Sequence, residues 1–160
     1  DAITPDRIQE ATRLIDRTLR QAGHARPRIA VAALNPHAGD GGNFGREEID
    51  VIEPAVRHMA GGQMAVTGPL PSDTVFLKVT KGEIDAVVTM YHDQGQIALK
   101  LLGFDRGVTV QGGLPVPVTT PAHGTAFDIA GQGTADVGAT RAAFEIVGKM
   151  VRNSQKETAA

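Results

Sequence analysis

The chain has 160 residues, enough for one domain with a hydrophobic core, and its 41% apolar and 21% charged residues are typical of globular proteins. A net charge of −2 provides no basic surface for nucleic acid or an anionic membrane. The absence of cysteine excludes disulfides, thiolate metal sites and a cysteine nucleophile, and fits a reducing compartment. No apolar run approaches the roughly 20 residues that span a bilayer. We expect a cytoplasmic protein.

The first half of the sequence predicts helices that alternate with strands. Thr4, Pro5 and Asp6 are typical of a helix start, and apolar residues at helical spacing extend this helix to Gly23. Pro54 would kink or shorten a later helix. The expected elements are a buried strand at 28–34, a glycine-rich loop at 35–45, a helix at 46–59, a strand at 64–67, a turn at 68–71 and a brief helix at 72–78.

The second half continues the alternation. We expect a buried strand at 84–91, a helix at 96–102, weaker strands at 108–110 and 116–118, a helix at 137–153 and a frayed tail at 154–160. The last helix should bury Ala139, Ala143, Ile146, Val147 and Met150. This order predicts an α/β fold, a layered, mainly parallel sheet with flanking helices, in a single unit over residues 1–153.

Polar side chains follow the buried strands, where α/β proteins bind ligands. His37 and His92 each lie just after such a strand, and imidazole is a common ligand of divalent metals. Asp40, Asp73 and Asp93 could add oxygen ligands or act as base or acid. Two histidines make no metal motif, however, and hydrogen bonding to loop backbone is an equally good interpretation.

Two glycine-rich loops and one lysine are further candidates for ligand binding. Residues 39–45 precede a helix, as phosphate-binding loops do, but match neither the Walker pattern nor the dinucleotide pattern G-x-G-x-x-G, so the loop taken alone favours a flexible connection. Lys100 would suit an anionic substrate, although most helix lysines are only solvated. In residues 123–133, His123 and Asp128 offer polar groups for a ribose or base, and a structural turn is the alternative.

Four segments resemble, in order, the motifs of the 4-hydroxythreonine-4-phosphate dehydrogenase family of pyridoxine biosynthesis. They are Asn-Pro-His-Ala-Gly-Asp-Gly-Gly at 35–42, Gly-Pro-Leu-Pro-Ser-Asp-Thr at 68–74, Tyr-His-Asp-Gln-Gly at 91–95 and His-Gly-Thr-Ala at 123–126. The resemblance covers nearly all of the chain but only the C-terminal part of a family member, so we expect a piece of a longer dehydrogenase that is inactive alone. Residues 123–133 are also similar to the adenosine-binding loop of isopropylmalate and isocitrate dehydrogenases, whose fold the family shares.

The resemblance implies a homodimer that oxidises and decarboxylates a phosphorylated hydroxy acid with a nicotinamide cofactor and a divalent metal (Zn, Mg, Mn or Co). His37 and His92 match two of three metal-binding histidines, and we expect those of one site to come from different subunits. Asp73 and Asp93 match acidic residues of the reaction centre, and Lys100 a substrate-binding lysine. The cofactor-binding positions implied are His123, Gly124, Thr125, Ala126, Asp128 and Ile129. Because a carboxylate at Asp128 would repel a 2′-phosphate, we expect NAD, with NADP as the alternative.

Two positions depart from the biosynthetic enzymes. Thr109 stands where they carry a substrate-binding asparagine, and Val118 where they carry an arginine. Loss of a cation that grips an anion changes substrate recognition. The sequence therefore looks closer to the branch acting on threonate or erythronate 4-phosphate than to enzymes of 4-phosphooxy-threonine. The alternative is a non-catalytic module that binds nucleotide or metal and dimerises.

Overall fold

The computed structural model describes residues 2–158, and contacts divide the chain into two compact units. The first comprises Asp1–Arg20 and His24–Gln96, and the second Gln21–Gly23 and Ile97–Ala160. The expectation that residues 1–153 act as a single unit of a longer dehydrogenase stays a prediction.

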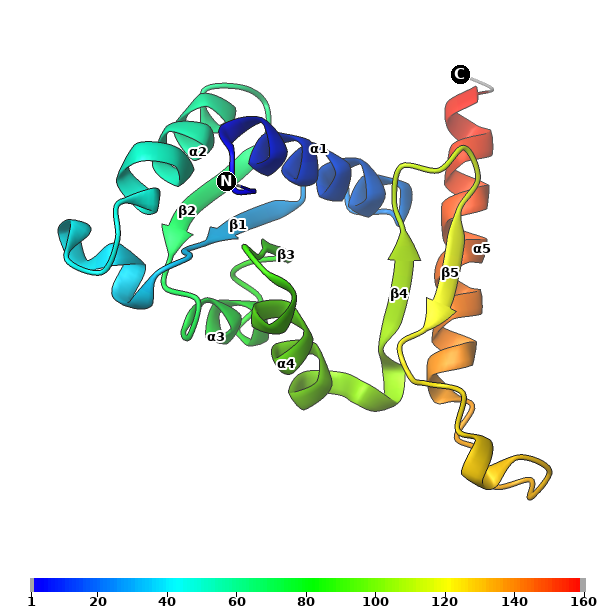
Figure 1. Ribbon diagram of the computed structural model, residues 1–160. Helices are drawn as coiled ribbons and strands as arrows, with labels where there is room; N and C mark the ends of the chain where they lie inside the picture. The colour runs from blue at the N-terminus through cyan, green and yellow to red at the C-terminus, as the bar shows by residue number, and fades with distance from the viewer. Residues whose placement is uncertain (1, 159–160) are drawn as a thin grey trace. The chain divides into compact units, whose positions relative to one another are not determined.

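The first unit is built on a three-stranded parallel sheet of order β2-β1-β3 (Figure 1). β1 (Arg28–Ala32) lies between β2 (Ala65–Leu70) and β3 (Ala86–Val88). Because successive side chains of a strand point to opposite faces, β1 supplies both cores: Ile29 and Val31 on one face, Ala30 and Ala32 on the other. The predicted α/β fold with a parallel sheet is confirmed.

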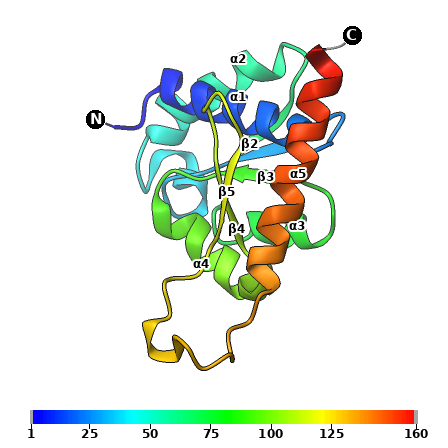
Figure 2. The ribbon, with the colours of Figure 1, turned by 90° about the vertical axis from the view of Figure 1, so that its right-hand side faces the viewer.

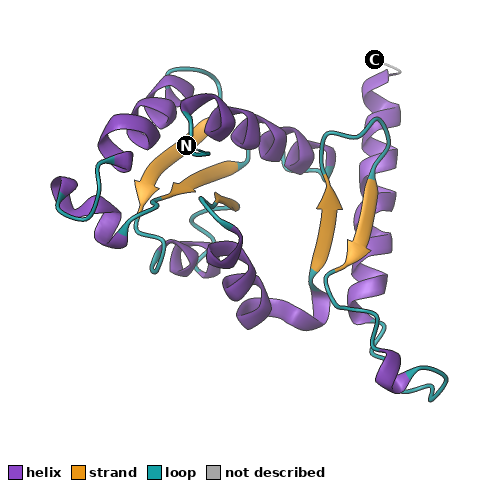
Figure 3. Ribbon diagram, viewed as in Figure 1, coloured by secondary structure: helices purple, strands orange, loops and turns teal. Residues whose placement is uncertain are grey.

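Helices cover both faces of this sheet (Figure 3). α1 (Pro5–Gln21) and α2 (Glu53–Ala60) pack on the face of Ile29 and Val31 through buried residues such as Ile8 and Met59. α3 (Val75–Thr80) packs on the opposite face through Val75. A sheet buried on both sides explains why β1 reads as a continuous apolar run.

The helix that contains Pro54 is irregular, as the proline predicts. A π-helical turn, η2 (Glu48–Ile52), precedes α2, and Pro54 occupies the first turn of α2, directly after this irregular turn. The turn places Glu48 on the inside of the unit, where only 3% of the residue is exposed.

The second unit is a β-hairpin packed on a long helix (Figure 2). β4 (Val108–Gln111) pairs antiparallel with β5 (Val118–Pro121), and the Thr119 hydroxyl donates a 2.9 Å hydrogen bond to the Ala143 carbonyl of α5 (Gly138–Thr158). Ala139, Ala143 and Met150 of α5 are buried as predicted, whereas Ile146 and Val147 are partly buried. Two 3-10 turns, η3 (Phe104–Arg106) and η4 (Phe127–Ile129), complete the unit.

Several predicted boundaries were wrong. Residues 68–70 belong to β2 rather than to a turn, since Leu70 pairs with Ala32 and accepts the Ala33 N–H at 2.8 Å. β3 is shorter than the predicted 84–91 because only three of its residues pair with β1. β5 begins at Val118 instead of residue 116, and helix α5 continues through residues 154–158, where a frayed tail was expected. Residues 159–160 lie outside the described part of the chain.

Candidate functional site

Three of the predicted site residues follow three neighbouring parallel strands. His37 comes after β1, Asp73 after β2 and His92 after β3, and all three are exposed. Because the carboxyl ends of parallel strands meet at one edge of a sheet, the topology brings these loops to the same edge of the first unit. This is the edge at which open α/β sheets bind ligands.

The loop that carries His37 has an unusual backbone. His37, Ala38 and Asp40 all have φ between 45° and 54°, and with the glycines between and beside them they form the short helical turn η1 (Pro36–Gly42). Left-handed conformations of residues other than glycine cost roughly 1–2 kcal/mol each. Such strain persists only where surrounding contacts hold the loop, which makes the holding residue important.

Glu48 is the residue that holds the loop of His37 in place. Its buried carboxylate accepts hydrogen bonds from the N–H groups of Leu34 and Asn35, both at 2.8 Å, and from the Asn35 side-chain amide at 2.9 Å. Burial alone would raise the pKa of the Glu48 carboxyl, but these hydrogen bonds outweigh it and lower the pKa. A Cβ at Gly39 would lie 2.7 Å from the Glu48 carboxylate, so the loop can approach only with glycine there.

The rest of this loop forms local contacts. Asn43 donates a side-chain hydrogen bond of 3.1 Å to Asp40, and the rings of His37 and Phe44 have centroids 6.0 Å apart. Two N–H groups that a phosphate cradle could use, those of Asn43 and Phe44, instead donate within the loop, to Asp40 and Gly39. The structure thus favours an ordered turn at residues 39–45 over the flexible connection considered from the sequence.

His92 lies on a helix rather than in a loop, because α4 (His92–Gly103) begins four residues before the predicted start. Its Nδ1 is 2.8 Å from the Asp93 carboxylate. Histidine ligands of metals commonly use one ring nitrogen for a carboxylate and the other for the metal, and the carboxylate fixes the orientation of the ring. The pair therefore leaves Nε2 of His92 for a ligand.

Gln94 fixes the position of this helix start. Its side-chain oxygen accepts the Met90 N–H at 2.8 Å, and its amide donates to the Ala33 carbonyl at 2.9 Å. Gln94 thereby links the segments that leave β3 and β1, which carry His92 and His37. The sequence alone assigned no role to Gln94, although it belongs to the motif at 91–95, and none to Glu48, which lies just after the glycine-rich loop at 35–45.

A complete metal site does not form within the described residues. No group of three or more histidine, cysteine, aspartate or glutamate side chains there is placed to hold a metal ion. Any metal bound by His37 or His92 would need further ligands, from another subunit, another part of the protein or water.

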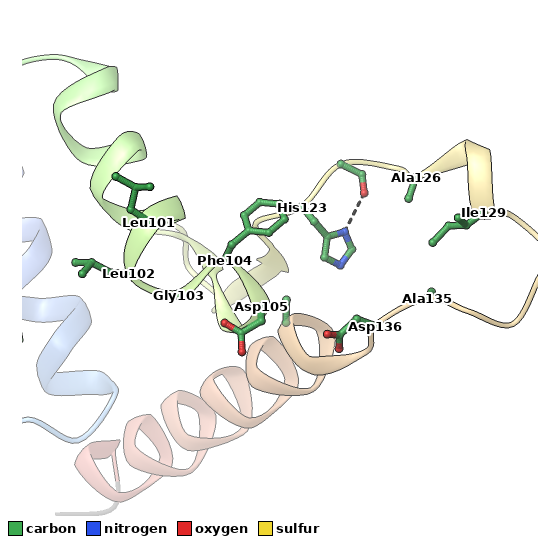
Figure 4. Close-up of a pocket in the computed structure, with 12 residues that line it drawn as sticks. Leu101, Leu102, Gly103, Phe104, Asp105, His123, Ala126, Ile129, Ala135 and Asp136 are labelled. Carbon is green, nitrogen blue, oxygen red and sulfur yellow. Dashed lines mark hydrogen bonds between the residues drawn. The ribbon is translucent and has the colours of Figure 1, made fainter.

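The second unit contains a pocket of about 750 Å³ beside the loop at 123–133 (Figure 4). Four predicted cofactor residues line it, namely His123, Gly124, Ala126 and Ile129, whereas Thr125 and Asp128 do not. The His123 ring makes a 2.9 Å hydrogen bond with the Gly124 carbonyl. Apolar side chains, including Leu101, Leu102 and Phe104, dominate the other wall, so the pocket suits a flat, largely apolar group.

Thr109 and Val118, the two positions that depart from the biosynthetic enzymes, lie on one face of the hairpin. Thr109 pairs with Thr120, and Gln111 pairs with Val118, so alternation puts all four on the same side of β4 and β5. They are exposed, whereas the alternate residues are partly buried toward α5. Lys100 is exposed on the part of α4 that belongs to the same unit.

In the described part of the chain, no helix has the length and apolarity required to cross a membrane.

Comparison with known proteins identifies the family. The family model of the pyridoxal phosphate biosynthetic protein PdxA matches residues 1–147. A Pseudomonas aeruginosa protein provisionally named 4-hydroxythreonine-4-phosphate dehydrogenase 2 is 65% identical over 154 residues, which cover 94% of this chain and 45% of that protein. A Bradyrhizobium diazoefficiens protein provisionally named D-threonate 4-phosphate dehydrogenase is 48% identical over 145 residues, or 84% of this chain and 42% of that protein.

Solved structures agree with this assignment. The 4-hydroxythreonine-4-phosphate dehydrogenase of Klebsiella pneumoniae superposes with a TM-score of 0.79 and 49% identity over 92% of this chain and 46% of that protein. The chain therefore spans about half the length of the relatives it matches. Since the family model covers 147 of its 160 residues, the chain belongs to the family of the pyridoxal phosphate biosynthetic protein PdxA.

Proposed function

We propose that the longer protein containing this chain is a dehydrogenase that oxidises, with decarboxylation, a phosphorylated hydroxy acid. It would use a nicotinamide cofactor and a divalent metal, as a homodimer in the cytoplasm. The observation that carries the proposal is the convergence of His37, Asp73 and His92 on one edge of the parallel sheet. The family membership and the names of the relatives support the reaction class.

His37 and His92 would hold the metal. The donor set suits a divalent ion, since both side chains are exposed and the Asp93 carboxylate orients the His92 ring. When bound, such an ion lowers the pKa of a coordinated hydroxyl and stabilises negative charge on neighbouring oxygens. Glu48 and Gln94 position the two histidines through the loop of His37 and the start of α4.

Asp73 is the proton acceptor in this proposal. The Asp93 carboxylate is engaged by His92, whereas no hydrogen bond to the Asp73 side chain occurs among the described residues. Asp73 would take the proton from the substrate hydroxyl as hydride leaves the carbon, and nicotinamide supplies the hydride acceptor when bound.

The pocket beside residues 123–133 would bind the adenosine end of the cofactor. Its apolar wall fits an adenine ring, and His123 with the neighbouring backbone offers polar partners for the ribose. Thr125 and Asp128 belong to the same loop and complete the proposed cofactor segment outside the pocket lining.

The substrate class follows from the exposed face of the hairpin. Thr109 and Val118 present a hydroxyl and a methyl group where a substrate-gripping amide and guanidinium are expected from the resemblance. Loss of the guanidinium and amide changes which substrate this face recognises, and we therefore propose threonate or erythronate 4-phosphate rather than 4-phosphooxy-threonine. The name given to the Bradyrhizobium relative supports the same choice.

The test is turnover and metal content of the full-length protein and its variants. The wild type should reduce a nicotinamide cofactor with a four-carbon phosphorylated hydroxy acid, and absence of turnover with every such acid would refute the proposal. His37→Ala and His92→Ala should each abolish metal binding and turnover.

Mixing the two inactive variants tests how subunits share the metal. If each site takes His37 from one subunit and His92 from the other, a randomly mixed dimer population recovers about one quarter of the wild-type metal and activity. If both histidines of a site belong to one chain, mixing restores nothing. A double variant carrying both substitutions on one chain, mixed with wild type, controls for subunit exchange.

A further inference from the structure

The pocket beside the 123–133 loop contains two carboxylates that the proposed function leaves without a role. Asp105 lies on the η3 turn, and Asp136 lies two residues before α5. Both line the pocket, whereas Asp128 does not. Figure 4 shows the two side chains on one side of the pocket, next to the start of α5.

Gly138 lies between the backbone of Asp105 and the carboxylate of Asp136. A Cβ placed on Gly138 would lie 2.8 Å from the Asp105 carbonyl oxygen and 3.1 Å from Oδ1 of Asp136. Both segments therefore approach the same point, and only a glycine at 138 leaves room for them. Within the described residues, neither carboxylate forms a salt bridge with a lysine, arginine or histidine.

Asp136 also lies at the N-terminus of α5, a part of the pocket that would attract an anion. Its Oδ1 accepts the Gly138 N–H at 2.8 Å, at the N-terminus of a helix of 21 residues. Free N–H groups and the helix dipole make such a terminus a natural phosphate site. With the Asp136 carboxylate already there and Asp105 lining the same pocket, a phosphate group meets negative charge instead.

We propose that Asp105 and Asp136 make this pocket selective for NAD by excluding the 2′-phosphate of NADP. The inference rests on the proposed function, because it assumes that the pocket holds the adenosine end of a nicotinamide cofactor. The 2′-phosphate is the sole chemical difference between the two cofactors, so a repulsive group at its site discriminates without improving any contact to NAD.

The experiment measures dissociation constants of NADH and NADPH for the full-length protein by cofactor fluorescence. The wild type should bind NADH more tightly. Asp105→Asn and Asp136→Asn should each reduce that preference on the order of tenfold, through tighter NADPH binding. Asparagine keeps the size of the side chain and can still accept the Gly138 N–H, so NADH binding should persist. Glu145→Gln, which removes an exposed charge of α5 outside the pocket, should leave the ratio unchanged.

The possible outcomes distinguish failure of the NAD-selectivity inference from failure of the proposed dehydrogenase function. An unchanged ratio in both variants, a loss of preference in Asp128→Asn alone, or a wild type that binds NADPH as well as NADH would overturn the inference and leave the dehydrogenase proposal standing. Failure of both cofactors to bind the wild type would overturn the proposed function and the inference with it. The NADH preference of the wild type should also weaken at high salt, since it arises from charge repulsion.

Discussion

Asn35 donates two hydrogen bonds to the buried carboxylate of Glu48, one from its backbone N–H at 2.8 Å and one from its side-chain amide at 2.9 Å. The bond pair connects the end of β1 with the π-helical turn and so secures the first residue of the loop that carries His37. Because this loop contains left-handed residues, its geometry depends on that anchor.

Glu48→Ala should destabilise the full-length protein by about 3 kcal/mol, because it leaves several buried donors without an acceptor. Urea unfolding measures the change. Glu47→Ala is the matched control, since Glu47 is exposed and accepts one hydrogen bond from the Asn35 amide. Equal losses in the two variants would contradict the anchoring role.

The stability contributed by Glu48 should depend on pH. Its pKa is lowered in the folded state, so the ionised carboxylate contributes stability above its ordinary value of 4.5. The contribution is lost as the pH falls through the lowered folded-state pKa. The difference in unfolding free energy between wild type and Glu48→Gln should therefore be largest near neutral pH and shrink under acid, and a difference that grows under acid would contradict it.

Gln94→Ala should reduce metal affinity and stability together. It removes the acceptor of the Met90 N–H and the donor to Ala33, at a cost of about 1–3 kcal/mol, and releases the start of α4 that carries His92. Calorimetric metal titration and urea unfolding of the full-length protein measure the two effects. Gln155→Ala, on the exposed surface of α5, should change neither.

Val118→Arg combined with Thr109→Asn should shift substrate preference toward 4-phosphooxy-threonine by at least about tenfold in the ratio of kcat/KM values. The two side chains lie on the same exposed face of the hairpin, so both can reach one ligand. Val116→Arg adds the same charge at an exposed residue between the strands and should leave the ratio unchanged. A similar shift with that control would assign the effect to net charge.

Lys100→Ala should lower kcat/KM for the phosphorylated substrate more than roughly tenfold while cofactor affinity stays constant, since a charge-assisted contact contributes about 1.5–3 kcal/mol. Lys149→Ala removes an exposed lysine from α5 and serves as the control. If kcat/KM is unchanged in Lys100→Ala, the lysine is an ordinary solvated helix residue.

The sequence by itself determined the fold class and the segments that matter. Short apolar strands that alternate with helical patterns predicted the parallel α/β core. A strand covered on both faces needs an apolar residue at every position, as at Ile29 to Ala32. The positions of His37 and His92 just after buried strands predicted a ligand-binding edge, since parallel strands end at the same side. These are local patterns that a single sequence carries.

Only the tertiary structure decided which residues hold the site in place. Glu48 and Gln94 act through partners 13 and 61 residues away, and Gly138 lies beside both the Asp105 carbonyl and the Asp136 carboxylate. It also decided where β2 ends and α4 begins, because pairing of Leu70 with Ala32 and the bond from Gln94 to Ala33 overrode the local turn and helix signals. Contacts between residues far apart in sequence produce no periodic pattern of apolar residues. They can therefore be identified only in the folded structure.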